Sequence, residues 1–183
     1  MPDRAPMNER EATMQFEQAI LPHLDAAYNL ARWLTGNDHD AQDVVQDASL
    51  RALKFFGGFR GGNSRAWFLT IVRNAFYNWL DKNRPREVSA AGDEELLTVE
   101  DPAVDPELLF ARSANIAAVR GAIEQLPVEF REITVLRELE EFSYKEIARI
   151  AGVPIGTVMS RLARARKQLQ EILAKTPEVG GRP

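Results

Sequence analysis

Apolar side chains recur at intervals of three and four residues through most of this sequence, which is the period of an amphipathic helix. We find no alternating strand pattern and no Asn-Gly hairpin signal, so the sequence predicts an all-α fold. The expected helices cover about residues 11–34, 37–56, 64–84, 108–126, 130–136, 143–151 and 154–169. Pro22 is expected to kink or split the first of them.

The same spacing identifies the side chains expected in the core. In the first three helices these are Phe16, Ile20, Leu24, Tyr28 and Ala31, then Ala41, Val44, Val45, Ala48, Ala52, Leu53 and Phe56, then Phe68, Ile71, Val72, Ala75 and Trp79. In the later helices they are Ile116, Val119, Ile123 and Leu126, then Ile147, Ile150, Val158, Leu162, Ala165 and Leu169. Asn37 or Asp38, and Asn63 or Ser64, are the expected N-caps of the second and third helices.

The composition changes between Arg86 and Pro106, where Ala, Gly, Asp, Glu and Pro replace large apolar residues. Such a stretch is typical of an interdomain linker. We therefore expect two small helical domains, at 11–86 and 108–175, joined by a flexible acidic linker at 87–107. The tails at 1–10 and 176–183 are expected to be disordered.

A helix-turn-helix is predicted within 143–169. Ser143 and Glu146 have the spacing of a capping box, and Gly152 ends the first helix. The face of the second helix opposite its apolar stripe is small, polar and basic, with Gly156, Thr157, Met159, Ser160, Ala163, Arg164 and Lys167. A helix of this kind fits a DNA major groove, with Ser160 and Arg164 near base edges and Arg161, Arg166 and Lys167 near phosphates. The alternative interpretation is a surface helix with a solvated basic face.

The distribution of charged side chains favours DNA binding only at the C-terminal end of the chain. The net charge is -4, but residues 87–107 contain eight acidic and no basic side chains, whereas 143–183 contain eight basic and three acidic ones. The absence of cysteine excludes disulfides, zinc-thiolate sites and a cysteine nucleophile. His23 and His39 fit no metal or triad pattern. No apolar run approaches the length of a membrane span, and the N-terminus lacks a signal core, so we expect a cytoplasmic protein.

Two further surfaces are expected in the N-terminal domain. The second helix has a polar row, Asp40, Asp43, Gln46, Asp47 and Arg51, which alone is more typical of a solvated face. The third helix interleaves aromatic, amide and basic groups on its outer side, with Thr70, Arg73, Asn74, Tyr77, Asn78 and Lys82. That combination suits a single-stranded nucleic acid, although aromatic residues at helical spacing more often belong to a core.

Three ordered blocks carry a family resemblance: DAQDVVQDASLRALK, FRGGNSRAWFLTIVRNAFYNWL and SYKEIARIAGVPIGTVMSRLARARKQL. They resemble the bacterial sigma factors of the extracytoplasmic function (ECF) group, within the sigma-70 superfamily, over about Ala19 to Leu173. The first block resembles that family's first conserved helix, the second its promoter-melting block, and the third its C-terminal promoter-reading domain.

The resemblance implies a role for each surface. Asp43, Gln46 and Asp47 match positions that dock on the beta-prime clamp helices of core RNA polymerase. Residues implied at the minus 10 element are Phe59, Arg60 and Gly61 in a base-capturing loop, with Trp67, Asn74 and Asn78 beside it. Residues implied at the minus 35 element are Thr157, Met159, Ser160, Arg161, Ala163, Arg164, Arg166 and Lys167. The linker would thread the polymerase, whose beta subunit is a further expected partner, and an anti-sigma factor is expected to hold the protein inactive.

The chain departs from the family pattern at several positions. Met159 occupies a position where many members of the family have Lys or Arg, and Ala163 occupies one where some members have a larger side chain. The capture loop is also unusual, because it contains Gly61, Gly62 and Asn63. We expect a specificity subunit, not an enzyme, with no cofactor or metal. Two alternatives are a stand-alone helix-turn-helix regulator and a nucleic-acid enzyme using Asp40, Asp43 and Asp47.

Overall fold

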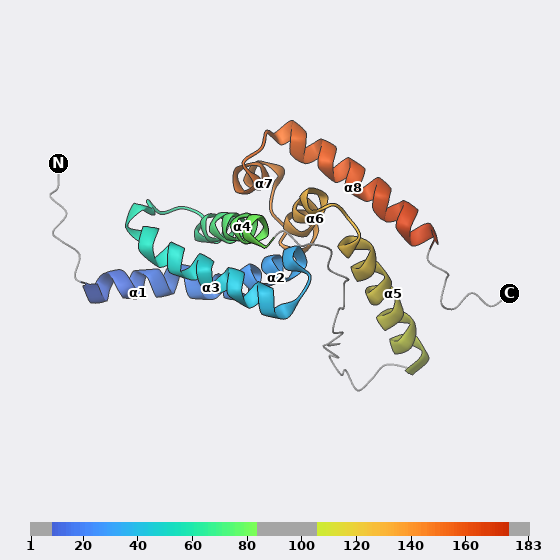
Figure 1. The fold of residues 1–183 in the computed structure, drawn as a ribbon, viewed down its shortest axis with the longest axis horizontal. Coiled ribbons are helices and arrows are strands. Elements are labelled where there is room, and N and C mark those ends of the chain that lie inside the picture. Colours follow the sequence, from blue (N-terminus) through green and yellow to red (C-terminus); the bar gives the residue numbers. More distant parts are fainter. Residues whose placement is uncertain (1–8, 84–105, 176–183) are drawn as a thin grey trace.

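The computed structural model describes residues 9–83 and 106–175, and every regular element in these ranges is helical (Figure 1). The all-α class is thereby confirmed. In the N-terminal half the elements are α1 (Glu9–Ile20), the 3-10 helix η1 (Leu21–His23), α2 (Leu24–Thr35), α3 (Asp38–Phe55), the 3-10 helix η2 (Phe56–Gly58) and α4 (Ser64–Lys82). In the C-terminal half they are α5 (Pro106–Glu124), α6 (Val128–Thr134), the π-helix η3 (Val135–Leu139), α7 (Tyr144–Ala151) and α8 (Ile155–Lys175).

The local signals for helix ends are confirmed. Pro22 splits the first predicted helix, since the chain passes through η1 between α1 and α2. Gly36 ends α2 with a φ of 85°, a left-handed conformation that glycine adopts without strain. The side chain of Asn37 accepts a hydrogen bond of 2.9 Å from the backbone N–H of Asp40 and so caps α3.

The N-terminal core lies between α2, α3 and α4. Its buried side chains include Ala27, Leu30, Ala31, Leu34, Ala41, Val44, Ala48, Ala52, Phe68, Val72 and Ala75. Leu53 is 52% exposed, so its assignment to the core was wrong. It follows Ala52 and therefore lies about 100° further around the helix, away from α2 and α4. Leu69 and Phe76 are also buried, because α4 is covered by the C-terminal half as well.

The helix-turn-helix forms as predicted. Ser143 and Glu146 make both bonds of a capping box at the start of α7, and Gly152 ends that helix with a φ of 66°. Val158, Leu162 and Ala165 are buried along α8.

The stripe predicted for α5 is only half correct. Ile123 and Leu126 are buried, whereas Ile116 is 65% and Val119 45% exposed. The reason is visible in Figure 1, where α5 diverges from α8 toward its own N-terminus, so its middle turns have no helix to cover them.

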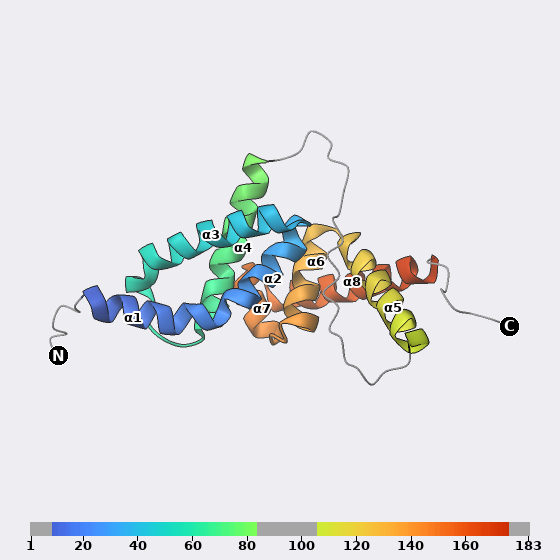
Figure 2. The same ribbon diagram turned by 90° about the horizontal axis from the view of Figure 1, so that it is seen from below.

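The two halves pack on one another. α4 contacts α7, α2 contacts α6, and a single cluster of buried residues runs through both halves (Figure 2). The predicted linker lies outside the described residues except at 106–107, where α5 has already begun. No helix within 9–83 and 106–175 is both long enough and apolar enough to cross a membrane.

Candidate functional site

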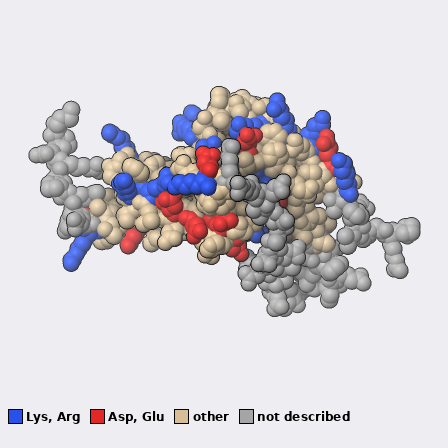
Figure 3. All heavy atoms as spheres, viewed as in Figure 1, with Lys and Arg blue, Asp and Glu red and all other residues tan. Residues whose placement is uncertain are grey.

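An acidic surface lies along α3. Asp43, Gln46 and Asp47 are all exposed, on the side of the helix opposite its buried alanine and valine stripe. Asp47 pairs with Arg51 at 2.9 Å, one turn along the helix. Acidic side chains gather over this part of the molecule in Figure 3. The predicted docking residues therefore form one continuous, solvent-facing row.

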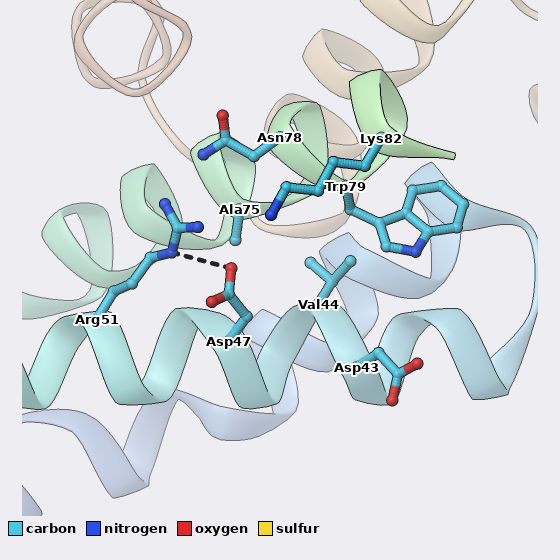
Figure 4. Close-up of a pocket in the computed structure, with 8 residues that line it drawn as sticks. All are labelled: Asp43, Val44, Asp47, Arg51, Ala75, Asn78, Trp79 and Lys82. Carbon is cyan, nitrogen blue, oxygen red and sulfur yellow. Dashed lines mark ion pairs between the residues drawn. The ribbon is translucent and has the colours of Figure 1, made fainter. Parts of the chain in front are cut away.

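A shallow hollow of about 150 Å³ separates the acidic row from α4 (Figure 4). It is lined by Asp43, Val44, Asp47, Arg51, Ala75, Asn78, Trp79 and Lys82. Asn78, which the resemblance places beside the minus 10 pocket, thus shares a depression with Asp43 and Asp47. A ligand that lies on α3 would also contact the last turns of α4.

The glycine loop between α3 and α4 is attached to an aromatic cluster. The ring of Phe59 lies 5.0 Å from that of Trp67 and 5.7 Å from that of Phe56. Phe59 is half-buried. It is partly covered because Phe56 and Trp67 offer it apolar contact. Gly61 and Gly62, with φ values of 85° and 95°, let the loop turn back to α4.

The outer side of α4 is divided between solvent and the C-terminal half. Asn74 and Asn78 are exposed. Arg73 and Tyr77, also expected outside, instead bind Glu132 of α6, through hydrogen bonds of 2.5 Å from Arg73 Nε and 2.8 Å from the Tyr77 hydroxyl. The assignment of these two side chains to the solvent face was wrong, because the second domain packs there.

Glu132 is fully buried. Burial raises the pKa of its carboxyl above the ordinary value of 4.5, while the charge of Arg73 and the hydrogen bonds from Arg73 and Tyr77 oppose that rise. Burial and the neighbouring Glu132 carboxylate also raise the pKa of Tyr77. A carboxylate in this position is stable only because it is paired and hydrogen-bonded.

Helix α8, the second helix of the helix-turn-helix, presents the predicted face to solvent. Met159, Ser160, Ala163, Arg164 and Lys167 are exposed, with Met159 at 54%. The hydroxyl of Ser160 donates to the carbonyl of Thr157 at 3.1 Å, but the oxygen keeps its capacity to accept. Lys and Arg side chains are visible over α8 in Figure 3.

Two of the side chains predicted to contact phosphates are less accessible than the sequence suggested. Arg166 forms an ion pair of 2.8 Å with Glu138 of η3. The hydrogen bond to Glu138 raises the pKa of the Arg166 guanidinium. Arg161 is half-buried. Arg164 and Lys167, both exposed, are the basic side chains of α8 that project most freely from the predicted face.

Sequence reasoning missed a set of residues that join the halves: Asn63, Arg65, Arg73, Tyr77, Glu132, Glu140 and Glu146. The hydrogen bonds between these residues join positions that are 55 to 83 residues apart, so no short-range pattern in the sequence could predict them. Within the described parts of the chain, no group of three or more His, Cys, Asp or Glu side chains could hold a metal ion, Asp40, Asp43 and Asp47 included.

Comparison with known protein families gives two matches in chain order. The sigma-70 region 2 model matches residues 19–86, and the sigma-70 region 4 model matches residues 116–169. These ranges include α3, α4 and the glycine loop in the first case, and the helix-turn-helix in the second.

Curated relatives align with most of this chain. The ECF RNA polymerase sigma factor SigE of Mycolicibacterium smegmatis is 34% identical over 91% of this chain, which spans only 65% of that protein. The ECF sigma factor EcfG of Rhodopseudomonas palustris is 36% identical over 85% of this chain and 81% of its own length.

Solved structures show the same arrangement of helices. The sigma factor RpoE of Bartonella quintana, in complex with the anti-sigma factor NepR, matches with a TM-score of 0.68 and 31% identity over 88% of this chain and 98% of its own. CnrH, in complex with the cytosolic domain of CnrY, matches with a TM-score of 0.62 and 26% identity over 92% of this chain and 91% of its own.

Proposed function

This chain belongs to the ECF group of RNA polymerase sigma factors, and from that premise we propose which of its surfaces meets which partner. Asp43, Gln46 and Asp47 of α3 bind core RNA polymerase at the beta-prime clamp helices. Arg164 and Ser160 of α8 read the minus 35 element as duplex. Phosphodiester chemistry belongs to the polymerase, and this chain supplies promoter choice and assistance in melting.

The observation that carries the proposal is the separation of two exposed surfaces of opposite charge. The acidic row on α3 suits a basic protein surface and repels DNA, whereas the basic side of α8 attracts DNA. Each row lies on a helix whose opposite side is buried in a core, so each is presented rigidly. A single chain can therefore bind polymerase and duplex DNA at the same time.

Melting is assigned to the glycine loop and α4. We propose that Phe59, Arg60 and Gly61 contact a base of the minus 10 element once it leaves the duplex, beside Trp67 and Asn74. Unstacking a base costs only a few kcal/mol, so one aromatic pocket is enough to bias an opened state. The half-buried cluster of Phe56, Phe59 and Trp67 supplies the stacking surface.

A regulatory partner is also proposed. Both structural relatives described above are bound to another chain, the anti-sigma factor NepR in one case and the cytosolic domain of CnrY in the other. We infer that an anti-sigma factor binds this chain and competes with polymerase for its exposed surfaces.

Co-migration tests the assignment against a stand-alone regulator. The purified chain is mixed with core polymerase and separated by size. The proposal requires a stoichiometric complex that carries promoter fragments, whereas a stand-alone regulator would dimerise on a palindrome and shift duplex DNA without polymerase. Failure to bind core polymerase, with unaided shifting of duplex DNA, would overturn the proposal.

A further inference from the structure

Four aromatic rings, from α1, η2, the glycine loop and α4, contact one another at one end of the N-terminal half. The ring of Phe56, at the start of η2, lies 5.7 Å from that of Phe59, 6.2 Å from that of Trp67 and 5.4 Å from that of Phe16. Phe59 and Trp67 are the two rings that the proposed function places at the captured base. Phe56 therefore connects this pair to Phe16, a residue of α1.

Helix α1 has no part in the proposed function. The sigma-70 region 2 match begins at residue 19, so Phe16 precedes it in the sequence. Figure 2 shows α1 running beside the last turns of α3, and the ring of Phe16 meets that of Phe56 edge to face, with an interplanar angle of 88°. Aromatic pairs favour this geometry, because the electropositive edge of one ring attracts the negative face of the other. Phe16 thus restricts the positions that the Phe56 ring can take.

The backbone around Phe59 does little to fix the position of its ring. Glycine pairs at 57–58 and 61–62 flank this residue, and glycine loses more conformational freedom on ordering than any other residue. The backbone N–H of Phe59 donates a hydrogen bond of 2.9 Å to the carbonyl of Phe56, which again makes Phe56 its anchor. The Phe59 ring is therefore held in place chiefly by its contacts with Phe56 and Trp67.

We propose that Phe16, acting through Phe56, is a positioning residue for base capture: the two rings hold Phe59 beside Trp67, so that the pocket is ordered before a base leaves the duplex. This inference rests on the proposed function and extends it to α1. An ordered pocket binds a base without the entropic cost of ordering a glycine loop at the same time. Truncation of Phe16 therefore weakens promoter melting, although Phe16 itself is not assigned to any contact with DNA or polymerase.

Fluorescence of the full chain without polymerase tests whether Phe16 orders the pocket. Trp33→Phe with Trp79→Phe leaves Trp67 as the only one of the three tryptophans in the sequence, so acrylamide quenching reports how well its indole is covered. In this background Phe16→Ala is expected to raise the quenching constant toward that of an exposed indole. Phe16→Leu keeps an apolar contact and should stay near the parent value. Ile20→Val, at a buried side chain of α1 that belongs to none of these ring pairs, is the control and should not change it.

Binding by the holoenzyme tests whether this order matters for capture. The probes are two pieces of a promoter identified by run-off transcription with the wild type: a forked fragment whose minus 10 element is single-stranded, and a duplex that carries only the minus 35 element. Phe16→Ala is expected to weaken binding of the forked fragment about fivefold, a factor within the range measured for aromatic pairs. Phe16→Leu should recover most of that loss. Binding of the minus 35 duplex and of core polymerase should stay unchanged, since α8 and α3 are intact.

Unchanged quenching of Trp67 in a correctly folded Phe16→Ala chain, judged by circular dichroism, would overturn the inference. An equal loss of affinity for the forked fragment in Ile20→Val, or an equal loss on the minus 35 duplex, would also overturn it, because the effect would then be one of general stability. If the wild-type holoenzyme initiates at no promoter, the proposed function fails. If it initiates and Phe16→Ala binds the forked fragment as the wild type does, this inference alone fails.

Discussion

Arg73 of α4 and Glu132 of α6 are 59 positions apart, and the guanidinium of the first donates a hydrogen bond of 2.5 Å to the fully buried carboxylate of the second. The pair connects the part of the chain that matches sigma-70 region 2 to the part that matches region 4. The predictions below concern the parts of the chain on which this account depends.

The capping box of α7 is expected to contribute measurably to stability. Ser143→Ala removes the hydroxyl that accepts from the backbone N–H of Glu146, so thermal or urea unfolding is expected to show a loss of about 1 kcal/mol. Ser49→Ala is the control, because that hydroxyl donates to Val45 within α3 and caps no helix. Equal losses in the two variants would contradict a capping role for Ser143.

Acid is expected to weaken the fold through His23. This half-buried ring lies 3.1 Å from the Ser64 hydroxyl, and burial together with the charge of Arg65 lowers its pKa below 6.5. The unfolded chain then binds the proton more tightly, so the stability due to neutral His23 is present above pH 6.5 and is lost as the pH falls from there through the lowered pKa.

Urea unfolding measured across that pH range checks this expectation. His23→Gln should flatten the dependence of unfolding free energy on pH. His39→Gln, at a side chain that is 85% exposed, should retain it. If His39→Gln flattened the dependence of unfolding free energy on pH and His23→Gln left it unchanged, the assignment of the acid sensitivity to His23 would be refuted.

Polymerase binding is expected to depend on the charge of Asp47. Because its ion pair with Arg51 is exposed, Asp47→Asn should alter the unfolding free energy by less than about 1 kcal/mol. The affinity for core polymerase, measured by fluorescence anisotropy of the labelled chain, should fall about tenfold through loss of a charge at an interface. Asp25→Asn, on an exposed position of α2, should leave that affinity unchanged. A similar loss of polymerase affinity in both variants would indicate that the net charge of the chain matters, and not docking of polymerase on α3.

Met159 gives a gain-of-function test. Met159→Arg places a cation on the exposed side of α8, so the chain should bind non-specific duplex DNA more tightly, with a salt dependence steeper by about 0.9 in the logarithmic slope. Met14→Arg, at a residue of α1 that is 57% exposed, adds the same charge elsewhere. If both variants steepen the salt dependence equally, α8 is not the DNA-binding helix.

The sequence predicted those features whose partners are close along the chain. Asn37 caps α3 through Asp40, and Ser143 caps α7 through Glu146, three positions on in each case. Such pairs depend only on local backbone geometry. For the same reason the position of the helix-turn-helix follows from residues 143–169 alone.

Periodicity alone did not reveal which apolar faces are covered. Leu53, Ile116 and Val119 have the right spacing but are exposed, because no neighbouring helix reaches them. Arg73 and Glu132 were missed for the opposite reason: each looks like an ordinary surface charge until α6 packs beside α4. The packing of two domains is a long-range property, and a single sequence carries no local sign of it.

Run-off transcription tests the central claim, that α3 and α8 of this chain together direct polymerase to promoters. Core polymerase and fragments of the host genome are transcribed with the wild type, Asp47→Ala, Arg164→Ala, and the charge controls Asp25→Asn and Lys175→Ala. The account predicts a discrete set of start sites with the wild type and both controls, and their loss with either Asp47→Ala or Arg164→Ala. Absence of specific initiation by the wild type, or undiminished initiation at the same sites by both substituted chains, would contradict it.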